Sequence, residues 1–125
     1  MKTTPTTHPK PPRPLEKAVQ KAIQQAMKLQ FGVVMIPVDS GGAGMRQGQA
    51  QGCGGWSSTP PGFPDLLGVI PGSGRACFIE VKRPGNKPTP AQFAFLETVR
   101  AKGAISFWAD SVDSALSQFR EQAAA

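Results

Sequence analysis

Tyrosine is absent from this chain of 125 residues, which has only one histidine and two cysteines. The histidine, His8, lies in a proline-rich stretch near the N-terminus, so we expect no histidine base or nucleophile. A structural zinc site takes about four ligands, mostly cysteine and histidine, and His8, Cys53 and Cys77 are too few to supply them. We therefore expect two free thiols in a reducing cytosol.

Long apolar runs are also absent. No stretch approaches the roughly 20 residues that a membrane-spanning helix needs. The residues that follow Met1 include no apolar core of a secretory signal. We therefore expect neither a membrane partner nor secretion.

Acidic residues are scarce: the chain has 8 Asp and Glu against 14 Lys and Arg, which gives a net charge of +6. A basic surface fits a polyanionic partner, and nucleic acid is the usual one. An anionic membrane would attract the same charge, but no strongly amphipathic basic helix with large apolar residues accompanies it. The charge balance therefore favours a nucleic-acid partner.

The rest of the chain is organised around residues 62–82. Two apolar segments flank Pro71–Gly74, a pattern typical of a β-hairpin. Counting outward from this loop puts Asp65 directly opposite Glu80, where Cβ atoms are about 4.5–5.5 Å apart and like charges repel. Lys82 lies two residues beyond Glu80 and points to the same face of the sheet.

Two explanations of these three charges remain open. Burial of charge is costly unless the charge is paired or bound to a metal. A divalent cation between Asp65 and Glu80 would remove the repulsion, and Lys82 would then lie beside it. The alternative is a salt-bridge ladder on a solvent-facing surface of the sheet.

The segments Gly62–Leu66 and Ile79–Lys82 together resemble the signature of the PD-(D/E)xK nucleases. Downstream, Thr89–Phe93 (Thr-Pro-Ala-Gln-Phe) narrows the resemblance to the VRR-NUC branch of that superfamily. The similarity covers roughly residues 15–119. It implies an α/β fold with a restriction-endonuclease-like core, in which helices flank a mixed sheet of about four strands.

The resemblance also implies a metal site that binds Mg²⁺ or Mn²⁺. Asp65, Glu80 and the carbonyl of Val81 would be its ligands, and Lys82 would act on the attacking water or the scissile phosphate. Two further residues would complete the site: Glu16 and Gln92. A favourable contact with the helix dipole explains Glu16 equally well, and helix capping alone explains Gln92.

The order of the elements agrees with that core. The sequence predicts a helix over 15–30 and a strand over 104–109. It also predicts a strand over 33–38, whose continuous apolar run suggests burial on both faces although Pro37 favours the end of the strand or the edge of the sheet. A helix begins after Thr89, and a last helix begins after Ser111. The helix between the hairpin and the strand 104–109 is a crossover, which makes that strand parallel to the one carrying Glu80 and Lys82.

Expected side-chain positions follow from helical spacing. In the helix that follows Thr89, we expect Phe93, Leu96 and Val99 to form the inner face. After the last helix, the chain end from Glu121 to Ala125 is expected to fray.

Two segments are expected to lie outside the folded core. Residues 1–14 form a flexible basic tail rich in proline, and 39–61 form a mobile glycine-rich loop beside the site. Within that loop, Arg46 is a candidate DNA contact, and Trp56 either stacks on an exposed base or anchors the loop by packing. In the turn after Lys82, the basic residues are Arg83 and Lys87, which are candidate phosphate contacts or simply solvated side chains.

The predicted function is a metal-dependent, structure-specific DNA endonuclease that hydrolyses phosphodiester bonds. Stand-alone members of the resembled family are similar to resolvases of four-way (Holliday) junctions, which implies a homodimer that cuts branched DNA. The alternatives are a flap or nicking nuclease, a nuclease acting on RNA, and a binding module without turnover. A small nuclease of this kind suits the cytoplasm of a bacterial host and an origin in a phage or prophage.

Overall fold

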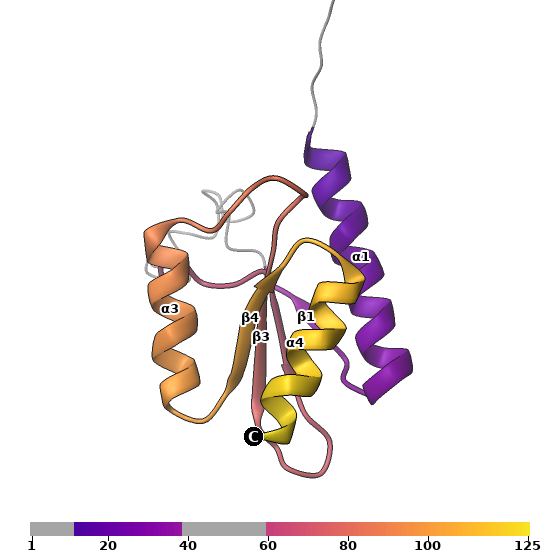
Figure 1. Ribbon diagram of the computed structural model, residues 1–125, viewed down its shortest axis with the longest axis vertical. Helices are drawn as coiled ribbons and strands as arrows, with labels where there is room; N and C mark the ends of the chain where they lie inside the picture. The colour runs from indigo at the N-terminus through magenta and orange to yellow at the C-terminus, as the bar shows by residue number, and fades with distance from the viewer. Residues whose placement is uncertain (1–11, 39–59) are drawn as a thin grey trace, which may run out of the picture.

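The computed structural model describes residues 12–38 and 60–125 (Figure 1). Within these ranges the chain forms helices and strands in the predicted order. They are α1 (Pro12–Phe31), β1 (Ile36–Pro37), β2 (Leu66–Val69), β3 (Ala76–Val81), α3 (Pro90–Ala101), β4 (Ile105–Ala109) and α4 (Val112–Ala124). None of these helices is long and apolar enough to cross a membrane.

The strands form one mixed sheet in the order β1-β2-β3-β4. Strand β2 is antiparallel to both β1 and β3, whereas β3 and β4 are parallel. The hairpin pairs Leu66 with Ile79 and Val69 with Ala76. That register, continued by one pair, places Asp65 opposite Glu80, as the sequence predicts.

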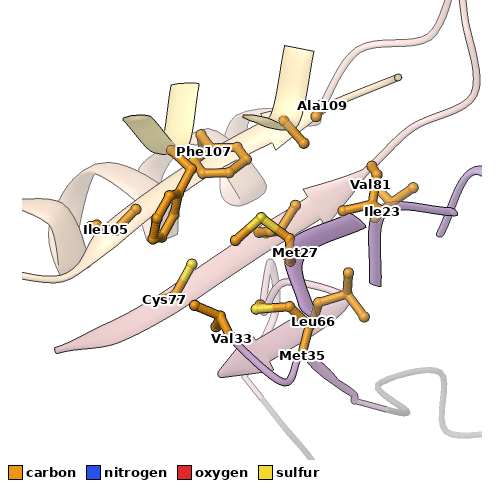
Figure 2. Close-up of a cluster of buried hydrophobic side chains, with 13 residues drawn as sticks. Ile23, Met27, Val33, Met35, Leu66, Cys77, Val81, Ile105, Phe107 and Ala109 are labelled. Atoms are coloured by element: carbon orange, nitrogen blue, oxygen red, sulfur yellow. The ribbon is translucent and has the colours of Figure 1, made fainter. Parts of the chain in front are cut away.

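Helices cover the sheet from both sides. In Figure 1, α1 and α4 lie against one face and α3 lies against the other. The main core fills the first of these interfaces (Figure 2). It consists of the apolar strand side chains that point toward α1 and α4, together with residues of these two helices. The side chains between them along each strand point toward α3. The largest of them are Ile23, Met27, Leu66, Ile79 and Ile105, all fully buried.

A smaller aromatic cluster fills the space between the sheet and α3. The rings of Phe63, Phe78 and Phe95 pack edge to face, with centroids 5.0–6.0 Å apart. Such pairs contribute roughly 0.5–1.5 kcal/mol each beyond the area they bury. This cluster fixes α3 over the end of the hairpin that carries Asp65.

The inner face of α3 differs from the prediction. Leu96 is buried, but Phe93 is 43% exposed, and Phe95 packs inward in its place. Phe95 is the α3 residue that packs against Phe63 and Phe78, and Phe93 is left on the rim. Thr89 caps α3 through its side chain, as predicted.

The first strand is also different. Residues 33–38 were expected to be buried on both faces, but Val33 and Met35 are buried whereas Val34 and Ile36 are 56% and 58% exposed. Only Ile36 and Pro37 pair with β2, at the edge of the sheet. Proline has no N–H for a ladder, which restricts it to such an edge.

The chain end does not fray where the sequence predicts. Helix α4 continues to Ala124 because Gln122 anchors it to β4. The side-chain oxygen of Gln122 accepts from the N–H of Ser106 at 3.0 Å, and its Nε2 donates to the Ser106 carbonyl at 2.9 Å. One turn earlier, Nε2 of Gln118 donates to the carbonyl of Trp108 at 2.8 Å.

At the other end of the chain, α1 begins at Pro12, three residues before the predicted start. Proline suits the first turn of a helix, where N–H groups have no intrahelical partner. The predicted tail, apart from 12–14, and the predicted glycine-rich loop, apart from 60–61, lie outside the described residues. Arg46 and Trp56 belong to that undescribed part.

Candidate active site

A glycine brings the hairpin against the start of α3. Gly62 has a φ of +84°, and a Cβ atom there would lie 2.5 Å from the carbonyl oxygen of Ala91. Any side chain would therefore collide with the helix backbone. The next residues lead through the fully buried Pro64 into Asp65. The sequence shows this glycine, but no pattern assigns it a role, because the close approach is a tertiary contact.

Asp65 is held at the beginning of β2. Its Oδ2 accepts a hydrogen bond from the backbone N–H of Val81 at 2.9 Å. Its backbone carbonyl accepts from the N–H of Val38 at 2.8 Å. These two contacts tie the carboxylate to β3 and the backbone to the segment after β1, so the carboxylate has a fixed position beside Glu80.

Glu80 is only 2% exposed, so the three charges do not form a solvent-facing ladder. Its Oε2 accepts from Nζ of Lys82 at 3.1 Å and from Nε2 of Gln92 at 3.0 Å. Its Oε1 is buried and has no hydrogen-bond partner among the described residues. A buried carboxylate oxygen without a donor is costly, which distinguishes this residue from a structural ion pair.

The environment of Glu80 disfavours its ionised form. Burial, the largest cause, and the neighbouring Asp65 carboxylate together raise the pKa of Glu80 from 4.5 to about 7, although Lys82 acts in the opposite direction. Desolvation and a neighbouring like charge both penalise a carboxylate. The folded protein therefore favours the protonated form of Glu80 more than an exposed position would.

Gln92 has two roles at once. Its side-chain oxygen accepts from the N–H of Thr89 at 2.8 Å, and its own N–H donates to the Thr89 hydroxyl at 3.2 Å. This is the predicted capping box. Its Nε2 donates to Oε2 of Glu80 at 3.0 Å, so the residue that caps the start of α3 also binds the buried carboxylate.

Glu16 lies on α1 at the side of Asp65. These two residues line a pocket of about 250 Å³ together with Lys17 and Gln20. Because α1 begins at Pro12, its first turn contains no acidic residue, and the dipole explanation of Glu16 is wrong. Within the described residues, no group of three or more His, Cys, Asp or Glu is close enough to hold a metal ion.

Comparison with known proteins agrees with this arrangement. The family model for the VRR-NUC domain matches residues 15–113. The chain belongs to the VRR-NUC domain family. The VRR-NUC domain is a nuclease-type domain that processes nucleic acid, with DNA as the substrate class. The family is consistent with the PD-(D/E)xK superfamily, so the resemblance carried by the hairpin and by residues 89–93 is confirmed.

Solved structures support the same assignment. One, titled "VRR_NUC domain", has a TM-score of 0.57 and 26% identity, and the match covers 84% of this chain and 94% of that one. Another, titled "VRR_NUC domain protein", has a TM-score of 0.57 and 20% identity, and covers 86% and 87%. The second shows the shared fold only. No curated protein matches the chain.

In this VRR-NUC domain, a basic turn follows the strand that carries Glu80. Arg83 is partly exposed and Lys87 is exposed. The N–H of Asn86 donates to the carbonyl of Arg83 at 3.1 Å, which closes the turn. Both basic side chains thus come from the segment that directly follows Lys82.

Proposed function

We propose that this VRR-NUC domain is a metal-dependent endodeoxyribonuclease, which hydrolyses phosphodiester bonds at Asp65, Glu80 and Lys82. The observation that carries the proposal is Glu80: a buried carboxylate next to a second carboxylate, with one oxygen that finds no donor among residues 12–38 and 60–125. A protein that only binds DNA has no use for this pair, because both charges repel phosphate. A hydrolase does need the pair, because the two carboxylates would hold a cation.

The donor atoms fit a hard divalent cation. Mg²⁺ and Mn²⁺ prefer oxygen ligands, and Mg²⁺ usually keeps several waters. Asp65, Glu80 and the Val81 carbonyl would hold the ion, and Glu16 would reach it from α1 through the pocket it shares with Asp65. Because water would complete the coordination, a cluster of three acidic groups is not required. When bound, such an ion lowers the pKa of a water and stabilises charge on the phosphate.

Lys82 and Gln92 both contact Oε2 of Glu80. Nζ of Lys82 is 3.1 Å from Oε2 of Glu80. As an ammonium it would orient the attacking water or contact the phosphate, and only as a neutral amine would it take a proton from that water. Gln92 donates to the same oxygen and so fixes the Glu80 side chain. Its amide is also placed to bond a water or a phosphate oxygen.

Contacts to the DNA backbone would come from basic residues near the site. Arg83 and Lys87 lie on the turn after β3, and Arg46 and Trp56 belong to the glycine-rich segment. The net charge of +6 supports binding to a polyanion.

For the substrate, we propose branched DNA, a four-way junction, cut by a homodimer. Two symmetric cuts need two active sites, and a twofold dimer is the commonest way to supply them. Exposed apolar side chains near β1 and β2 suit a contact between two copies: Val34, Ile36 and Val69 are 56%, 58% and 62% exposed. A flap or nicking nuclease is the alternative. We also expect the protein to act in the cytoplasm of a bacterial cell, as a phage or prophage product.

The decisive experiment is cleavage of end-labelled four-way junction, flap and linear duplex DNA in Mg²⁺, Mn²⁺ or EDTA. Wild type is compared with Glu80→Gln and with Glu121→Gln, which changes an exposed glutamate of α4 in the same way. We expect cleavage that needs the cation, is lost in Glu80→Gln and persists in Glu121→Gln. Tight binding with no cleavage under any cation would support the binding module instead, and a monomer at micromolar concentration would contradict junction resolution.

A further inference from the structure

A groove beside the carboxylate pair has no role in the function proposed above. It lies between α3 and α4, over the outer edge of β4, and encloses about 200 Å³. Helix α3 contributes Phe93 and Arg100, β4 contributes Trp108, and α4 contributes Gln118. In Figure 1, α3 and α4 stand on the two sides of β4.

Both aromatic residues of the groove, Phe93 and Trp108, are connected to Glu80 through a direct neighbour. Trp108 is the registered partner of Glu80 across the parallel pair β3 and β4. Its side chain faces α3, as does that of Ser106, whose hydroxyl donates to the α3 carbonyl of Leu96 at 2.6 Å. On the helix, Phe93 follows Gln92, which donates to Glu80.

The fold itself does not account for the position of Phe93. Phe93 is 43% exposed although the next turn of the helix buries Leu96 to 6% exposure. Phe93, Leu96 and Arg100 follow the i, i+3, i+7 spacing of one helix face, and all three line the groove. The exposed phenyl ring of Phe93 and the partly exposed indole of Trp108 therefore line the same groove next to the site.

The charges of the groove favour a base over a phosphate. Arg100 contributes a positive charge, but Glu97 lies in the same lining and cancels it. A phosphate would gain little in a groove without net positive charge. A neutral aromatic ring gains by stacking, which is worth roughly 1–3 kcal/mol per base and does not depend on which base is present.

We propose that Phe93 and Trp108 hold an unpaired nucleobase of the DNA strand whose phosphate lies at Glu80. This rests on the proposed function, and it specifies the substrate: DNA with an unstacked nucleotide next to the scissile phosphate. In an intact duplex every base is stacked between its neighbours, so none can enter the groove. Branched, frayed or flapped DNA supplies such a base.

The test measures binding in EDTA, so that cleavage does not interfere. The probes are a branched DNA with 2-aminopurine as the unpaired nucleotide beside the branch, and a duplex with 2-aminopurine paired inside it. We expect wild type to quench the unpaired probe by stacking. Phe93→Ala should lose this quenching and bind the branched probe about tenfold more weakly, equivalent to about 1.4 kcal/mol, with unchanged affinity for the duplex.

Two further variants make the result specific. Phe93→Leu keeps an apolar side chain but removes the ring, so it should lose the quenching as Phe93→Ala does. Leu29→Ala removes apolar surface from a residue of α1 that is 74% exposed, and should behave as wild type. Circular dichroism and thermal melting establish that all variants fold, which the exposure of both positions favours.

Three outcomes would overturn the proposal: no quenching by wild type, equal weakening on branched and duplex DNA, or dissociation of a dimer by Phe93→Ala in light scattering. The last would identify the groove as a protein interface. Failure of the nuclease is seen separately. If no DNA is cleaved with Mg²⁺ or Mn²⁺ while the quenching depends on Phe93, the base site stands and the nuclease fails. If cleavage occurs without quenching, only the base site fails.

Discussion

Replacing Glu80 by glutamine should stabilise the metal-free protein at alkaline pH. The folded-state pKa of Glu80 is about 7, against 4.5 for an ordinary glutamate. The folded state thus holds its proton more tightly than the unfolded state. The resulting stabilisation is fully present below pH 4.5 and is lost as the pH rises through about 7.

The magnitude follows from the two pKa values. Each pKa unit corresponds to about 1.36 kcal/mol, so ionising Glu80 costs the fold about 3 kcal/mol at pH 8. Glutamine has nearly the same shape and carries no charge, but it leaves Lys82 without its ionic partner. We therefore expect Glu80→Gln to gain about 1–3 kcal/mol at pH 8 and almost nothing at pH 4.

Urea unfolding in EDTA, at pH values between 4 and 8, measures this difference. The free energy of unfolding of wild type should fall relative to that of Glu80→Gln as the pH rises. Glu121→Gln should show no such pH-dependent difference, because Glu121 is exposed. If the glutamine variant is less stable at pH 8, or if the difference does not change with pH, the burial argument for Glu80 is wrong.

Three further predictions concern the same site. Mg²⁺ or Mn²⁺ should raise the melting temperature of wild type in a concentration-dependent way, because a ligand that binds only the folded state stabilises it; a similar rise in Glu80→Gln would place the ion elsewhere. Gly62→Ala should lower the free energy of unfolding in urea by about 2 kcal/mol or more, because its Cβ would collide with α3; Gly72→Ala, with φ +88° but nothing within 4 Å, is the matched control and should cost less. Gln92→Ala should lower the free energy of unfolding by about 1–2 kcal/mol in the same assay, because the cap and the bond to Glu80 are lost. Gln92→Glu should keep the cap and raise the pKa of Glu80, which NMR titration measures. An unchanged pKa would contradict the contact.

The parts of the fold that local chemistry determines were predictable from the sequence. The Pro71–Gly74 turn fixes the hairpin register, so Asp65 could be placed opposite Glu80 by counting, and the structure confirms it. The cap of α3 is equally local, because Thr89 and Gln92 are three residues apart. Their types and spacing are sufficient to define it.

The parts that depend on packing between distant segments were not predictable in the same way. The sequence left two explanations of Glu80 open, since its burial depends on how α3 covers the hairpin. That cover depends in turn on Gly62, whose contact with Ala91 joins segments far apart in the chain. The sequence prediction placed Phe93 on the inner face of α3 and buried both faces of residues 33–38, and both predictions were wrong. The reason is the same, since hydrophobic period alone does not say which neighbouring element covers a face.

The two glutamines of α4 also determine how this domain can associate with other chains. A strand at the edge of a sheet normally presents free N–H and C=O groups, on which a foreign strand can add. Along β4, the amides of Gln118 and Gln122 already bond the carbonyls of Trp108 and Ser106 and the N–H of Ser106. Helix α4 therefore blocks the addition of a foreign strand, and the growth of fibres, at the β4 edge. We expect a second copy to dock through side chains rather than by extending the sheet from β4.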